Sequence, residues 1–221
     1  MAYLKAGDHC LVPDSVYGPC RNLCDTLLKG FGIETTYYEP AIDEAGAAAL
    51  MRDNTRVLYT ESPGSHTFEL QDIPALARVA HARGAKLLMD NTWGIRNFQP
   101  FRHGVDVSIQ ALTKYVVGHS DVLLGSVTVK NAEWPAIKTA QATLGQYASP
   151  DDVWLALRGS RNLGNLRRRP RDHSRPRAGA WAGRVSRRDA RRAILVATKR
   201  ARDGRLAWRQ HRANTSARRS I

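Results

Sequence analysis

Apolar positions in the first 157 residues recur in two alternating patterns. Short apolar or β-branched runs predict strands, and longer stretches with Ala and Leu at helical spacing predict helices between them. The predicted strands are residues 9–12, 33–38, 56–60, 86–90, 105–110 and 122–129, and the predicted helices are residues 20–31, 44–52, 73–83, 132–147 and 151–157. This alternation predicts an α/β fold with a mainly parallel sheet flanked by helices.

Polar and aromatic side chains follow several predicted strands at the point where each strand ends. Tyr17 comes after the first strand, Ser62 after the third, and Asp90 closes the fourth. The carboxyl ends of parallel strands meet at one edge of the sheet, where ligands bind. We therefore expect these three residues to converge.

Lys114, beside Thr113, lies shortly beyond Asp90 in the chain. Pyridoxal phosphate needs a lysine for a Schiff base, a carboxylate against its ring nitrogen, and hydroxyls or N–H groups for its phosphate. The pattern favours this cofactor. Asp90 would keep the ring nitrogen protonated, Thr113 would reach the phosphate, and Tyr17 would cover the ring face.

The motifs around these residues resemble the Cys/Met-metabolism family of pyridoxal-phosphate enzymes. The resemblance runs from about residue 3 to about residue 161. It is carried by Lys5-Ala6-Gly7-Asp8-His9, the Tyr17 loop, Glu61-Ser62-Pro63-Gly64-Ser65, Asp90-Asn91-Thr92-Trp93 and the lysine run through Gly118-His119-Ser120-Asp121. Trp93 and the Ser-Ile-Gln-Ala run at residues 108–111 are more similar to the β-lyase branch than to the γ-synthase or γ-lyase branches.

The resemblance implies a partial large domain of a fold type I enzyme and an activity. The activity would be carbon–sulfur bond cleavage in transsulfuration, converting L-cystathionine to homocysteine, pyruvate and ammonia. Lys114 and Tyr17 would be catalytic, and with Asp90 and Thr113 they would hold the cofactor. Ser62 and Trp93 would line the substrate pocket, and no metal is expected. The γ-synthase and methionine γ-lyase activities remain alternatives, separable by assaying pyruvate against 2-oxobutyrate.

Family members are nearly twice as long as this chain of 221 residues. The resemblance implies a preceding arm that contacts the neighbouring subunit's cofactor, and a C-terminal domain whose arginine binds the substrate carboxylate. Neither has a counterpart in the matching segment. We expect impaired activity, partial loss of the family's dimer or tetramer interface, and poor solubility of the isolated chain.

The positive charge is confined to the end of the chain. Residues 158–221 hold 21 of the 34 basic and 3 of the 20 acidic residues, so their net charge is +18 and that of the first 157 residues is −4. We expect a cofactor-binding domain over residues 1–163 and an Arg-rich, disordered, non-family tail over residues 164–221. Our hypothesis is that the reading frame is lost near Gly164. The alternative of another class is a non-catalytic protein that binds nucleic acid through residues 165–221.

Three cysteines, Cys10, Cys20 and Cys24, are expected to be small apolar fillers rather than a disulfide or metal set. No apolar run reaches the length of a membrane span, and the N-terminus lacks a secretory segment. We expect a cytoplasmic enzyme that acts on a small amino-acid substrate and does not associate with membranes.

Overall fold

The computed structural model describes residues 1–95, 97–165 and 192–196. The strands are β1 (His9–Pro13), β2 (Glu34–Tyr38), β3 (Thr55–Glu61), β4 (Lys86–Asp90), β5 (Val107–Ala111), β6 (Gly125–Val129) and β7 (Arg192–Val196). The α-helices are α1 (Gly18–Leu23), α2 (Glu44–Leu50), α3 (Ile73–Ala82), α4 (Trp134–Thr143) and α5 (Pro150–Asn165). Two π-helical turns, η1 (Cys24–Leu28) and η3 (Thr113–Val117), and two 3₁₀ turns, η2 (Pro100–His103) and η4 (Asn131–Glu133), complete the description.

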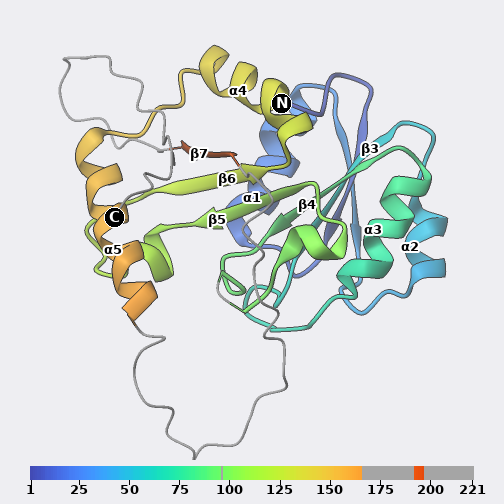
Figure 1. The fold of residues 1–221 in the computed structure, drawn as a ribbon. Helices are drawn as coiled ribbons and strands as arrows, with labels where there is room; N and C mark the ends of the chain where they lie inside the picture. Colours follow the sequence, from blue (N-terminus) through green and yellow to red (C-terminus); the bar gives the residue numbers. More distant parts are fainter. Residues whose placement is uncertain (96, 166–191, 197–221) are drawn as a thin grey trace, which may run out of the picture.

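The strands form one sheet in the order β2-β1-β3-β4-β5-β6-β7 (Figure 1). The pairs among β1 to β5 are parallel, whereas β6 runs antiparallel to both β5 and β7. The predicted α/β fold with a mainly parallel sheet is therefore confirmed. Because parallel strands end at the same edge, β1, β3, β4 and β5 deliver their C-terminal loops to one place.

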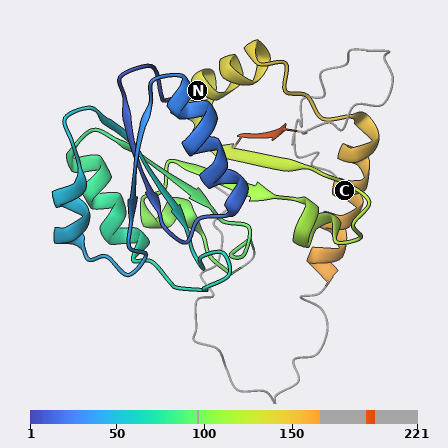
Figure 2. The ribbon, with the colours of Figure 1, turned by 180° about the vertical axis from the view of Figure 1, so that it is seen from behind.

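Alternating side chains of the central strands enter two separate cores. Leu11, Leu58 and Leu87 pack with α2 and α3 on one face, while Cys10 and Val57 pack with α1 and η1 on the other. Figure 1 shows α2 and α3 together on one side of the sheet, and Figure 2 shows α1 on the opposite side. This two-residue alternation explains why the strands read as nearly continuous apolar runs.

The three cysteines belong to the core beneath α1 and η1. Cys10 and Cys24 are buried, Cys20 is half-buried, and all three are free thiols. Interaction with the other two thiols lowers the pKa of Cys24, and interaction with Cys24 raises the pKa of Cys10 and of Cys20. The expectation of packed, unbridged cysteines agrees with this arrangement.

A third apolar cluster joins η3 to α5. Helix α5 lies beyond the end of β5 (Figure 1). Gly159 of α5 makes this approach possible, since a Cβ atom there would lie 1.9 Å from the Val116 carbonyl oxygen. The sequence predicted this helix only over residues 151–157, whereas it continues to Asn165. The close contact therefore fixes the turn that carries Lys114.

The segment after residue 163 is described only in part. Arg192–Val196 forms β7, which pairs with β6. The remaining residues of the predicted disordered tail, 166–191 and 197–221, lie outside the described part, as does most of the segment proposed to bind nucleic acid.

Candidate active site

Three loops meet at the carboxyl edge of the sheet. Asp90 is paired with Glu61 on one side and with Ile109 on the other. The backbone N–H of Tyr17 donates to Glu61 Oε2 at 2.8 Å. The loops after β1, β3 and β4 therefore converge, as the sequence predicted for Tyr17 and Asp90.

Asp90 is a half-buried carboxyl at the end of β4. Burial raises its pKa, partly opposed by Thr92, whose backbone N–H donates to Asp90 Oδ1 at 2.8 Å. A carboxylate that burial destabilises as an anion gains from a cationic partner. This environment fits a protonated pyridine nitrogen, which is the partner that pyridoxal phosphate would present.

Lys114 reaches the same edge through a contact between the loops after β4 and β5. The Ala111 N–H donates to Thr92 Oγ1 at 2.8 Å. Asp90 lies two residues before Thr92, and Lys114 lies three residues after Ala111. Lys114 is exposed on η3, so its amine is accessible.

Thr113 has an additional structural role. Its hydroxyl accepts from the Leu124 N–H at 2.9 Å and donates to the Leu124 carbonyl at 3.3 Å. A phosphate oxygen needs a hydroxyl donor, so phosphate binding would replace the longer of these two contacts. The sequence did not predict this bridge, because it depends on the antiparallel return of the chain.

The two residues expected to line a substrate pocket differ in their surroundings. Ser62 is buried, and its hydroxyl accepts from the Gln71 N–H at 3.0 Å, which closes the loop after β3. Trp93 is exposed, with ring centroids 5.3 Å from Phe68 and 6.0 Å from Tyr115. Trp93 thus presents an accessible aromatic surface against Tyr115, which follows Lys114 in the chain, whereas Ser62 shapes the loop.

Glu61 is the residue that the sequence reasoning did not identify as part of the site. It is 4% exposed, lies beside Asp90 in the sheet and contacts Tyr17 and Ser65. Burial and the charge of Asp90 raise its pKa, while the two hydrogen bonds oppose the rise. An acidic residue closing a buried strand, directly before Ser62, was the available signal.

His119 follows the lysine turn. Its Nδ1 lies 2.5 Å from the Val117 carbonyl oxygen. This contact sits in the loop that leaves η3, so it supports the turn rather than the chemistry.

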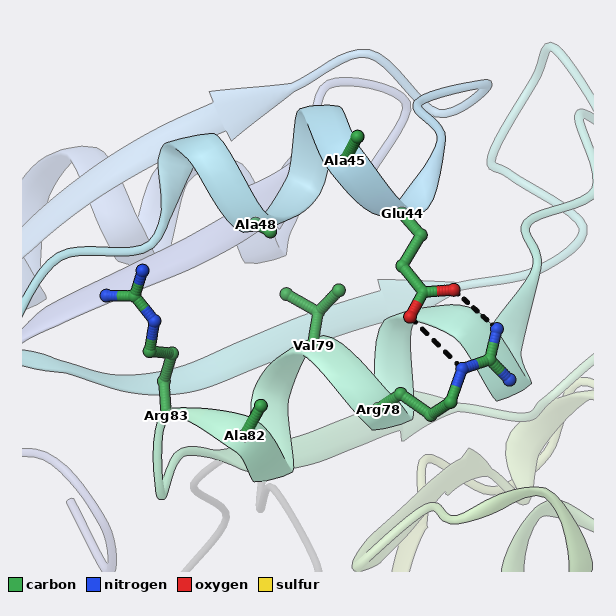
Figure 3. Close-up of a pocket in the computed structure, with 7 residues that line it drawn as sticks. All are labelled: Glu44, Ala45, Ala48, Arg78, Val79, Ala82 and Arg83. Carbon is green, nitrogen blue, oxygen red and sulfur yellow. Dashed lines mark hydrogen bonds and ion pairs between the residues drawn. The ribbon is translucent and has the colours of Figure 1, made fainter.

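A hollow between α2 and α3 lies on one face of the sheet rather than at its carboxyl edge (Figure 3). Its carboxylate is paired with a guanidinium, since Glu44 accepts from Arg78 Nε at 3.1 Å and Nη2 at 2.5 Å. Alanines and Val79 form much of the remaining lining. Because its carboxylate is already paired, this hollow is a weaker candidate than the strand-end site.

Comparison with known proteins shows the family to which the chain belongs. The model of the Cys/Met metabolism PLP-dependent enzyme family matches residues 1–179. The chain belongs to this family. The family's cofactor is pyridoxal phosphate, which agrees with the cofactor predicted from the sequence.

Individual relatives give the same result. A Rhizobium johnstonii protein provisionally named cystathionine beta-lyase is 52% identical over 74% of this chain and 41% of its own length. The cystathionine beta-lyase of Bordetella avium is 44% identical over 74% of this chain and 41% of its own length. The structure of cystathionine gamma-lyase from Lactobacillus plantarum complexed with L-serine matches with a TM-score of 0.69 and 33% identity, covering 73% of this chain and 42% of that one.

The chain thus spans about two fifths of the length of these two curated relatives. The family match extends beyond residue 163, where the sequence placed the domain boundary, so that boundary stays a prediction. In the described part of the chain, none of the helices has both the length and the apolar character needed to cross a membrane.

Proposed function

We propose that this chain is the cofactor-binding part of a carbon–sulfur lyase that cleaves L-cystathionine to homocysteine, pyruvate and ammonia. The Thr92–Ala111 contact carries the proposal, because it joins the loop of Asp90 to the loop of Lys114. The similarity to two relatives named cystathionine beta-lyase supports this choice of substrate.

Each site residue has a proposed role. The ε-amine of Lys114 would hold the cofactor through its aldehyde and, once the substrate amine has displaced it, would take the proton from the substrate Cα. Asp90 would hold a proton on the ring nitrogen, Tyr17 would cover the ring, and Thr113 would bind the phosphate. Trp93 would border the thioether, with Ser62 fixing the loop beside it. When bound, the cofactor withdraws electrons from the substrate Cα.

Lys114 is also the proposed donor to the departing sulfur. An amine that has taken up the Cα proton is an ammonium and can return that proton to the homocysteine thiolate. The exposed position of Lys114 at the start of η3 allows this reach. A cytoplasmic location, expected from the sequence, and a homo-oligomeric assembly, implied by the resemblance, remain predictions.

An assay of the full 221-residue chain with pyridoxal phosphate and L-cystathionine tests the proposal. Because activity of this chain is expected to be impaired, we expect slow pyruvate formation, its loss in Lys114→Ala, and its retention in the matched control Lys138→Ala, an exposed lysine on α4. Production of 2-oxobutyrate instead of pyruvate would assign a γ-cleaving activity. Pyruvate formation that survives Lys114→Ala would contradict the assignment of the lysine.

A further inference from the structure

Glu61 ties three segments of the site together although it faces away from solvent. One carboxylate oxygen accepts from the Tyr17 N–H at 2.8 Å, and the other accepts from the Ser65 hydroxyl at 2.5 Å. Its strand neighbour is Asp90. Both oxygens are therefore engaged by protein donors, so Glu61 is not placed to contact a substrate through a free oxygen.

The Tyr17 ring has little else to fix it. Tyr17 is 49% exposed, so packing restrains its side chain weakly. Its carbonyl is held in place, because it accepts from the N–H groups of Cys20 and Arg21 at 2.8 and 3.1 Å. The hydrogen bond from the Tyr17 N–H to Glu61 restrains the other end of the residue, and together these bonds fix the position of the Tyr17 Cα atom.

The loop after β3 is fastened to the Tyr17 loop next to Glu61. The Ser65 N–H donates to the Ser15 carbonyl at 3.0 Å. A Cβ atom at Gly64 would lie 2.5 Å from Ser15 Oγ, so the two loops are in close contact. Glu61 lies under this junction and bonds to both sides of it.

We propose that Glu61 is a positioning residue, whose two hydrogen bonds hold the Tyr17 backbone and thereby aim the Tyr17 ring over the cofactor. The inference rests on the proposed role of Tyr17. It assigns the effect to the shape and reach of the Glu61 side chain, and not to its charge beside Asp90.

Two conservative variants separate reach from charge. In Glu61→Gln the amide oxygen can still accept from Tyr17 N–H, and the amide nitrogen can donate to Ser65 Oγ, so both contacts persist without the charge. In Glu61→Asp the charge persists, but the side chain is one methylene shorter and cannot reach both donors. Glu39→Gln, on an exposed glutamate, is the matched control.

The first readout does not need the cofactor. Hydrogen exchange of the Tyr17 amide, followed by NMR on the full chain, should accelerate about tenfold in Glu61→Asp, since the shorter side chain no longer accepts from the Tyr17 N–H. It should stay within about twofold of the parent in Glu61→Gln and Glu39→Gln. Unchanged exchange in Glu61→Asp, or equal acceleration in Glu61→Gln, would overturn the positioning role.

The second readout is the dissociation constant for pyridoxal phosphate. We expect about tenfold weaker binding in Glu61→Asp, near-parent binding in Glu61→Gln, and no further loss when Glu61→Asp is added to Tyr17→Ala. Additive losses would mean that Glu61 does not act through Tyr17. If the parent chain fails to bind the cofactor while the exchange pattern holds, the proposed function fails and the contact to Tyr17 stands.

Discussion

Asp90 shows how a single residue can favour function over stability. Burial raises the pKa of Asp90. Burial also raises the pKa of Glu61, which lies next to Asp90 in the sheet. A carboxyl whose folded pKa exceeds its unfolded pKa binds more protons when folded, so stability falls as pH rises between the two values. The cofactor-free chain therefore carries a penalty at neutral pH that a cationic ring nitrogen would offset.

Replacing Asp90 by Asn should remove part of this penalty. As the pH rises above about 4, the free energy of unfolding of the cofactor-free parent chain should decrease. It should decrease less in the cofactor-free Asp90→Asn variant. Urea unfolding at several pH values measures it, with the exposed Asp53→Asn as control. A variant that is less stable than the parent at pH 7 and equal at pH 4 would contradict this account.

Among the elements, the contact between α5 and η3 sets the position of the lysine turn. The backbone of η3 lies against Gly159, and apolar side chains of both segments share one cluster. Atoms added to a packed interior displace their neighbours. A larger residue at position 159 would therefore displace the turn that bears Lys114.

Gly159→Ala should displace α5 from η3 and lower the free energy of unfolding by about 1–3 kcal/mol. Gly30→Ala is the matched control, because Gly30 is helical and a Cβ there would meet no atom within 4 Å. The control should be neutral or stabilising by up to about 1 kcal/mol. Thermal or urea unfolding of both variants decides it, and equal behaviour of the two would refute the contact.

Most elements could be predicted from the sequence because they have local causes. β4 matches its predicted range, and α3 begins after Asp72, whose side chain accepts from the Ala75 N–H, and ends before Gly84. The predicted alternation of strands and helices produced the correct sheet class. These features depend on periodicity and capping, which a sequence displays directly.

The features that were missed depend on tertiary contacts. The full length of α5 relies on Gly159 meeting η3, although glycine usually weakens a helix. β7 forms within an Arg-rich segment by pairing with β6. The Thr113 bridge to Leu124 and the two bonds of Glu61 join residues far apart in the loops. The proposed roles of Lys114, Tyr17 and Thr113 toward a cofactor stay predictions.

At the scale of the whole molecule, the outer face of the α1–η1 segment is apolar. Leu23, Leu27 and Phe31 recur at four-residue spacing and are 42%, 48% and 47% exposed. Leu23 ends α1, Leu27 lies in η1 and Phe31 lies in the turn that follows, so these three exposed side chains form an apolar stripe along this segment. A stripe of this kind favours self-association of the chain.

Leu27→Glu should reduce self-association, measured by light scattering as a function of concentration, and change stability by less than about 0.5 kcal/mol. The adjacent Leu28 is buried in the core beneath η1. Leu28→Glu should instead destabilise the fold by about 3 kcal/mol or more, because a charge would be buried without a partner. Unchanged scattering in Leu27→Glu would exclude the stripe as the cause of association.

The most direct measurement is to treat the full chain with pyridoxal phosphate, reduce it with borohydride and locate the modified lysine by peptide mapping. The account predicts modification at Lys114 as the dominant product, lost in Lys114→Ala and strongly weakened in Asp90→Asn. Modification spread over surface lysines, with Lys114 no more reactive than Lys138, would contradict it.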